Sequence, residues 1–260
     1  MLRIGAVSYL NTKPLIHTLA DQLGSRGKLT LDLPSRLAAD LATGKLDVAL
    51  IPSVEYFRGD GYSIVSDAAI GCRGPVWSVR LLSRVPIPEI KTLALDEGSR
   101  TSAAMTQVLL WEMHGLRPAT VPMAIDQTPE DVDADAILLI GDRAMHTPPG
   151  VYHEIWDLGD RWCRWTELPF VFAMWVAREG VDTTGLAAIL ESSRDSGLAN
   201  LESIAAIDAG SHGLTKEDLY RYFAENLNFR LGPGEQLALD TFRARASSIG
   251  LAPKPTVPSA

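Results

Sequence analysis

The 260-residue sequence has few cysteines and few histidines. It has only two cysteines, Cys72 and Cys163, which are far apart and lie outside any CxxC motif. A disulfide framework is therefore disfavoured, and two buried free thiols are expected. The five histidines show no HExxH spacing, so no metal site is predicted.

Long hydrophobic runs are also missing. No apolar segment approaches the ~20 residues that a membrane-spanning helix needs. Residues 1–7 lead directly into a strand-like pattern, without the charged start, apolar stretch and cleavage site of a signal peptide. We therefore expect a cytoplasmic protein with no membrane partner.

Positive charge is scarce, because 24 Lys and Arg face 32 Asp and Glu and leave a net charge of −8. Nucleic-acid binding needs clustered basic residues, and no basic tract is present. A small anionic ligand remains compatible with this balance if local donors, rather than the overall field, hold it.

The first half of the chain alternates between strand and helix patterns. Apolar segments predict buried strands, and the segments between them predict helices capped by Asn11 and Ser35. The strands are expected at residues 2–7, 29–33 and 47–51, and the helices at 11–23 and 35–42. This order is typical of a parallel sheet with right-handed crossovers, and thus of an α/β protein.

A second α/β unit follows the proline-rich segment 85–88, which indicates a crossing between two lobes. Two lobes joined by two crossings predict a hinge-bending fold with a cleft between the lobes. We assign residues 1–86 and 178–260, including C-terminal helices, to lobe 1, and residues 87–177 to lobe 2. Ligands in such folds bind at the carboxyl ends of strands and at helix N-termini.

Two polar segments follow strands of the first lobe. Ser8-Tyr9-Leu10-Asn11 is either a donor-rich wall of the cleft or an ordinary turn capped by Asn11. Ser53 stands where a helix N-terminus could present N–H groups to an anion. Glu55, two residues on, is either a general base or a surface carboxylate.

Three further segments could face the same cleft. Ser78 follows a Gly74-Pro75 turn and is either a cleft residue or a serine at a strand start. The segment from Ser99 through Arg100 and Thr101 to Ser102 follows a strand and opens a helix, which favours binding of a carboxylate or phosphate. Asp142 follows another predicted strand.

Taken in order, these segments resemble one enzyme family. The opening Ile4-Gly5-Ala6-Val7-Ser8-Tyr9-Leu10-Asn11-Thr12-Lys13-Pro14-Leu15 is similar to that of chorismate dehydratases, which act in the futalosine route to menaquinone. Shorter matches run through the first two thirds of the chain. They are residues 44–56, 74–79, 99–102, 141–144 and 168–173.

The resemblance implies a fold like the type II periplasmic binding proteins and a cofactor-free reaction, in which chorismate loses water to give 3-[(1-carboxyvinyl)oxy]benzoate. An alternative is the later 1,4-dihydroxy-6-naphthoate synthase of that pathway, whose opening resembles Ser-Pro-Cys-Pro-Asn-Asp, a motif absent here. A non-catalytic small-anion receptor or sensor is the other alternative. The oligomeric state, monomer or homodimer, stays open.

For this reaction we expect Asn11 and Ser78 to be catalytic, by orienting the substrate and hydrogen-bonding the departing oxygen. The base is either Glu55 or a carboxylate of the substrate itself, because no histidine lies within the matched motifs. The expected substrate-binding residues are Ser8, Tyr9, Ser53, Ser99, Arg100, Thr101, Ser102 and Asp142.

Overall fold

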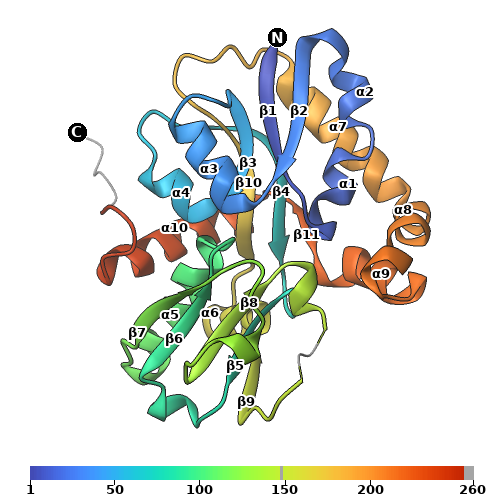
Figure 1. Ribbon diagram of the computed structural model, residues 1–260. Helices are drawn as coiled ribbons and strands as arrows, with labels where there is room; N and C mark the ends of the chain where they lie inside the picture. Colours follow the sequence, from blue (N-terminus) through green and yellow to red (C-terminus); the bar gives the residue numbers. More distant parts are fainter. Residues whose placement is uncertain (147–148, 255–260) are drawn as a thin grey trace.

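Two β-sheets, one in each half of the molecule, form the framework of the computed structural model, which describes residues 1–146 and 149–254 (Figure 1). The first sheet has the strand order β11-β4-β10-β3-β1-β2. Its strands are β1 (Leu2–Val7), β2 (Gly27–Asp32), β3 (Val48–Pro52), β4 (Ser63–Cys72), β10 (Phe170–Ala177) and β11 (Asn228–Arg230).

The second sheet has the order β7-β6-β8-β5-β9. Its strands are β5 (Val79–Ser83), β6 (Thr92–Asp96), β7 (Ala119–Met123), β8 (Ala136–Ile140) and β9 (Glu154–Asp157). The α-helices are α1 (Lys13–Ile16), α2 (Leu19–Leu23), α3 (Pro34–Ala42), α4 (Ser53–Arg58), α5 (Thr101–His114), α6 (Leu158–Thr166), α7 (Leu186–Ala199), α8 (Leu201–Asp208), α9 (Lys216–Arg221) and α10 (Pro233–Ser248).

The first sheet is built on the parallel strands that the apolar segments predict. β1 pairs in parallel with β2 and β3, and β10 adds antiparallel pairing to β3 and β4. Every residue of β3 and β10 is buried. Helices cover this sheet on both sides, with α3 on β1 and β3 and α7 on β4, as expected for strands that are apolar throughout (Figure 1). The predicted two-lobed α/β fold is thus confirmed.

The helix α7 holds the segment that follows β1. Ser193 Oγ donates to the Leu15 carbonyl at 2.9 Å. A Cβ at Gly197 would lie 1.8 Å from the Pro14 carbonyl oxygen, so only glycine lets α7 approach α1 this closely. The helix α7, which comes late in the chain, therefore packs against α1 and holds the segment that follows β1.

Two predicted helix caps are wrong. Asn11 lies inside a 3₁₀ turn, Leu10–Thr12, because the extended Tyr9 takes the N-cap position, and the predicted helix 11–23 is split into α1 and α2. Ser35 lies in the first turn of α3, since Pro34, whose φ is already helical, starts the helix one residue earlier. The predicted start of α5, in contrast, is confirmed.

The chain changes sheet earlier than the predicted lobe boundaries at 86 and 177. β5 pairs antiparallel with β8 in the second sheet, whereas β10 belongs to the first. The crossings therefore lie at residues 73–78 and 158–169. The proline-rich segment 85–88 leads from β5 into a 3₁₀ turn, Ile87–Glu89, so it lies within the second half rather than at a crossing.

In the part of the chain that the structure describes, no helix is long and apolar enough to cross a membrane. No group of three or more metal-ligating His, Cys, Asp or Glu side chains occurs among the same residues. Cys72 and Cys163 are both free thiols; Cys72 is buried as expected, and Cys163 is partly exposed.

Candidate functional site

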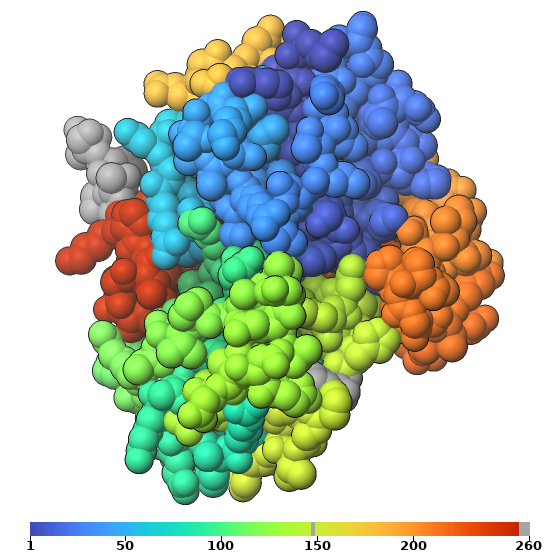
Figure 2. Space-filling model, in the orientation of Figure 1, coloured from blue at the N-terminus to red at the C-terminus, as the bar shows by residue number. Residues whose placement is uncertain are grey.

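A cavity lies between the two sheets, where the blue and green parts of the molecule meet in Figure 2. It is lined from both sheets and from the first crossing by Val7, Tyr9, Asn11, Pro34, Pro52, Ile70, Val76, Ser78, Val79, Gly98, Ser99, Arg100, Thr101, Ser102, Ile140, Gly141, Phe172, Ala173 and Leu227. Seven of the predicted site residues thus line one cavity.

Tyr9 reaches from the first half of the molecule into the second. A Cβ at Gly141 would lie 3.0 Å from its ring, and a Cβ at Gly98 would lie 2.9 Å from its Oη. Burial raises the pKa of Tyr9 well above its usual value, so its hydroxyl stays protonated. This buried Oη has no hydrogen-bond partner among the described residues.

The N-terminus of α5 forms a second wall. Thr101 and Ser102 begin this 14-residue helix, and their backbone N–H groups have no acceptor within it. Arg100, immediately before the helix, lines the cavity with its neighbours. A helix dipole, free N–H groups and a guanidinium together suit a carboxylate ligand.

Asn11 and Ser78 complete the polar lining. Asn11 Oδ1 accepts a hydrogen bond from the Thr12 hydroxyl at 3.2 Å, which leaves its amide N–H groups as donors. Ser78 is 1 % exposed, and its Oγ accepts a hydrogen bond from Tyr222 Oη at 2.8 Å.

Asp157 fixes the loop before Ser78. Its carboxylate accepts hydrogen bonds from the backbone N–H groups of Val76 at 2.9 Å and Trp77 at 2.6 Å. The same carboxylate caps α6 by accepting from Asp160 N at 3.0 Å. One side chain therefore connects the two crossings between the sheets.

Four predicted ligand or base residues do not line the cavity. Ser8 is exposed. Ser53 is fully buried, and its Oγ donates to the Val171 carbonyl at 2.8 Å and lies 3.3 Å from Thr101 Oγ1. Its hydroxyl is therefore used for packing α4 against α5. Glu55 and Asp142 also serve in contacts between the halves, as described next.

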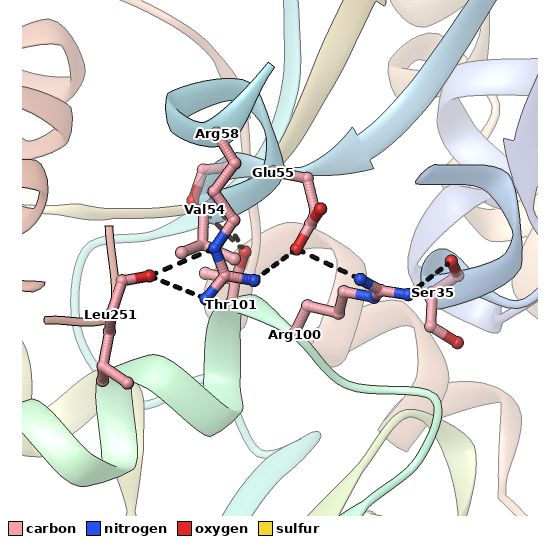
Figure 3. Close-up of polar contacts among 8 residues, drawn as sticks. Ser35, Val54, Glu55, Arg58, Arg100, Thr101 and Leu251 are labelled. Atoms are coloured by element: carbon pink, nitrogen blue, oxygen red, sulfur yellow. Dashed lines mark hydrogen bonds and ion pairs between the residues drawn. The ribbon is translucent and has the colours of Figure 1, made fainter. Parts of the chain in front are cut away.

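Glu55 is held by two arginines (Figure 3). Its Oε1 lies 2.7 Å from Arg58 Nη1 and 3.4 Å from Arg100 Nη1. Arg100 comes from the second half of the molecule and also lies 3.5 Å from the Ser35 carbonyl. Glu55 therefore helps to place Arg100 at the edge of the cavity instead of facing into it.

Asp142 connects the opening turn to the second sheet. Its Oδ1 accepts a hydrogen bond from Leu10 N at 3.0 Å, and its Oδ2 lies 3.5 Å from His212 Nε2. Burial raises the pKa of Asp142, although the Leu10 N–H opposes this shift. Asp142 thus joins the two halves of the molecule through a contact that lies outside the cavity lining.

Arg143, next in the chain, pairs with a buried carboxylate. Its Nε donates to Asp96 Oδ2 at 2.9 Å. Burial raises the pKa of Asp96, and the Arg143 guanidinium opposes the shift. The Asp96 Oδ1 accepts from Gly98 N at 3.0 Å, which shapes the loop that leads into α5.

The residues that sequence reasoning missed come from later parts of the chain. Tyr222, Asp157 and Leu227 all contact or line the site, yet none follows a predicted parallel strand. The described lining residues include no carboxylate and no histidine. The cavity is therefore largely apolar with a small number of donors, and its described lining has no ordinary protein base.

Known proteins and a protein family match this chain in sequence. A family model described as menaquinone biosynthesis matches residues 2–248. The chorismate dehydratase of Thermus thermophilus is 30% identical to this chain over 270 residues, which cover 95% of this chain and 95% of that protein.

Solved structures with low sequence identity share the fold. A crystal structure of a protein from Archaeoglobus fulgidus matches with a TM-score of 0.76 and 17% identity, over 96% of this chain and 98% of that chain. The periplasmic aliphatic sulphonate binding protein of Escherichia coli matches with a TM-score of 0.62 and 16% identity, over 97% of this chain and 88% of that chain. These matches confirm the predicted periplasmic-binding-protein-like fold.

Replacing Asp157 by Ala tests its role in the crossings. The variant Asp157→Ala leaves three N–H groups without their acceptor, so the free energy of unfolding should fall by about 2–3 kcal/mol. Asp160→Ala, in the first turn of the same helix, removes a solvent-facing pair with Arg164 and should cost less than about 1 kcal/mol. Chemical denaturation measures both, and equal losses would contradict the role of Asp157.

Proposed function

Because this chain belongs to the menaquinone-biosynthesis family, as its opening motif predicts, we propose that it is a chorismate dehydratase. It converts chorismate to 3-[(1-carboxyvinyl)oxy]benzoate and water, and is thus a carbon–oxygen lyase. The observation that carries this proposal is the cavity between the sheets, whose described lining holds the donors of Asn11, Ser78 and the N-terminus of α5 but no ordinary base.

The two carboxylates of chorismate need cationic or N–H partners. Arg100 and the first N–H groups of α5 provide one such place, together with the Ser99 and Ser102 hydroxyls. The unpaired Oη of Tyr9 provides a donor on the opposite wall. A buried hydroxyl without a partner is costly, and a substrate oxygen would remove that cost.

The reaction breaks the ring C3–H and C4–O bonds and forms a C3=C4 double bond, which makes the ring aromatic. The electron pair of the C3–H bond enters the ring, and the hydroxyl leaves with the electron pair of the C4–O bond. The proton from C3 and this hydroxyl together account for the water released. The protein must orient the substrate, accept the proton through some base, and stabilise the departing oxygen.

A carboxylate of the substrate is the base that fits this cavity. Tyr9 is held protonated and Arg100 is a permanent cation, and these are the ionisable side chains of the described lining. Asn11 and Ser78 then donate hydrogen bonds to the departing C4 oxygen. The protein contributes orientation and hydrogen-bond donors, and it uses no cofactor.

The activity is tested by incubating purified protein with chorismate. The dehydratase should remove the diene absorbance and yield a product lighter by one water in mass spectrometry. Tight binding of chorismate without turnover would contradict the proposal and favour the receptor or sensor alternative. Turnover of a later pathway intermediate, with chorismate left unchanged, would favour the naphthoate synthase alternative.

Replacing Asn11 by Ala should lower kcat by at least about 100-fold, because a donor to the departing oxygen is lost. The fold should remain intact, since the only side-chain hydrogen bond of Asn11 in the described structure is to its neighbour Thr12. The exposed Ser8 in the same turn provides the matched control, and Ser8→Ala should keep near-normal kcat. Near-normal turnover of Asn11→Ala would remove Asn11 from the mechanism.

Glu55→Gln separates the two candidate bases. The variant keeps the shape of the side chain and removes its charge. Because Glu55 lies outside the cavity lining, beside Arg58 and Arg100, kcat should stay within about threefold of the unaltered protein. A loss of kcat comparable to that of a removed general base, about 100-fold or more, would identify Glu55 as the base instead.

A further inference from the structure

The hydroxyl of Ser78 receives a hydrogen bond from a residue outside the cavity. Tyr222 Oη donates to Ser78 Oγ at 2.8 Å, and both side chains are 1 % exposed. A serine hydroxyl has one proton of its own. When Ser78 Oγ accepts from Tyr222, that proton remains available to a group in the cavity that Ser78 lines.

Tyr222 stands at the start of a π-helix, Tyr222–Asn226, that continues α9. Such wide turns are rare and are frequent at functional sites. Both the first and the last residue of this π-helix contact the loop before Ser78. The Tyr222 ring packs edge-to-face on Trp77 with centroids 5.8 Å apart, and Asn226 Nδ2 donates to the Pro75 carbonyl at 2.9 Å.

The contacted loop has a costly backbone conformation. Trp77 has a φ of 63°, in the left-handed region that bulky residues avoid. The N–H of Ser78 donates to the Val76 carbonyl at 2.7 Å across Trp77, which makes a tight three-residue turn. A conformation of this kind persists only where its surroundings hold it. Here Asp157 and the π-helix Tyr222–Asn226 both hold the loop.

We propose that Tyr222 is a positioning residue for the dehydration, which fixes the Ser78 hydroxyl as a donor toward the departing oxygen. The inference rests on the proposed function of the cavity. A hydroxyl that accepts one hydrogen bond is polarised and donates the next one more strongly, so the pair acts as a short relay. Tyr222 itself does not line the cavity.

The phenol of Tyr222 does not supply the proton. Complete burial raises the pKa of Tyr222 far above its ordinary value, and the hydrogen bond to Ser78 only partly opposes this shift. Tyr222 therefore stays neutral throughout the pH range of an activity assay. Its removal should change the rate without introducing a new step in the pH profile of kcat.

The variant Tyr222→Phe removes the hydroxyl and keeps the ring that packs on Trp77. The expected result is a fall in kcat of about tenfold, with KM within about twofold, because one hydrogen bond in the relay is lost. Tyr220→Phe is the matched control, since Tyr220 is 40% exposed and lies just before the π-helix. Its kcat should not change, and thermal unfolding should show that both variants are folded.

A double-mutant cycle distinguishes positioning from simple support of the fold. If Tyr222 acts through Ser78, adding Tyr222→Phe to Ser78→Ala should change the residual kcat, measured with enzyme in excess, by less than about twofold. A further tenfold loss in the Ser78→Ala background would overturn the inference. If the unaltered protein turns over chorismate and Tyr222→Phe has the same kcat, the inference on Tyr222 is overturned and the proposed function stands. No turnover by the unaltered protein would overturn the proposed function and this inference together.

Discussion

The site depends on the contact between the side chain of Tyr9 and two glycines across the boundary between the sheets. Gly141, with φ at +67°, leaves the space for the ring, and Gly98 leaves the space for the hydroxyl. Any larger residue at Gly141 would both strain the backbone and displace the ring. Because Tyr9 follows β1 and both glycines follow strands of the second sheet, this contact brings the polar turns of the two halves together.

The remaining contacts between the halves reinforce this arrangement. Asp142 accepts from Leu10 N, and Arg100 approaches Glu55, so each half supplies a partner to the other on two sides of the cavity. The carboxylates of Asp142 and Glu55 lie outside the lining, whereas Arg100 is part of it. The cavity itself is left with neutral donors and one guanidinium, which suits a substrate that carries its own negative charge.

The sequence was informative wherever a site residue directly follows a strand or opens a helix. Asn11 and the segment from Ser99 to Ser102 were predicted for that reason, and they line the cavity. The same rule failed for Ser53, because the N-terminus of the short helix α4 is covered by α5 and its hydroxyl is used by Thr101 and Val171. A polar residue that follows a strand in the sequence can be covered by another element, and the local sequence does not show which one.

Other parts of the site could not be predicted from local patterns. Tyr222 lies 144 residues from Ser78, and no periodicity in a helical segment indicates that one of its tyrosines will contact a loop so far away. The lobe boundaries failed for a similar reason. The proline-rich segment 85–88 resembles a linker, but β5 before it is held in the second sheet by pairing with β8, which is a long-range property.

The fold is shared with the periplasmic aliphatic sulphonate binding protein of Escherichia coli, so the fold alone does not distinguish a binding protein from an enzyme. The proposed enzyme differs from a binding protein in its hydrogen-bond donors, Asn11 and Ser78, which act on the departing C4 oxygen of chorismate. The most direct test is a crystal structure of the slow Asn11→Ala variant with chorismate. We expect the ring in the cavity, the C4 oxygen within hydrogen-bond distance of Ser78 Oγ, and a carboxylate at the N-terminus of α5. A ligand outside the cavity, or a C4 oxygen directed away from Ser78, would contradict the account.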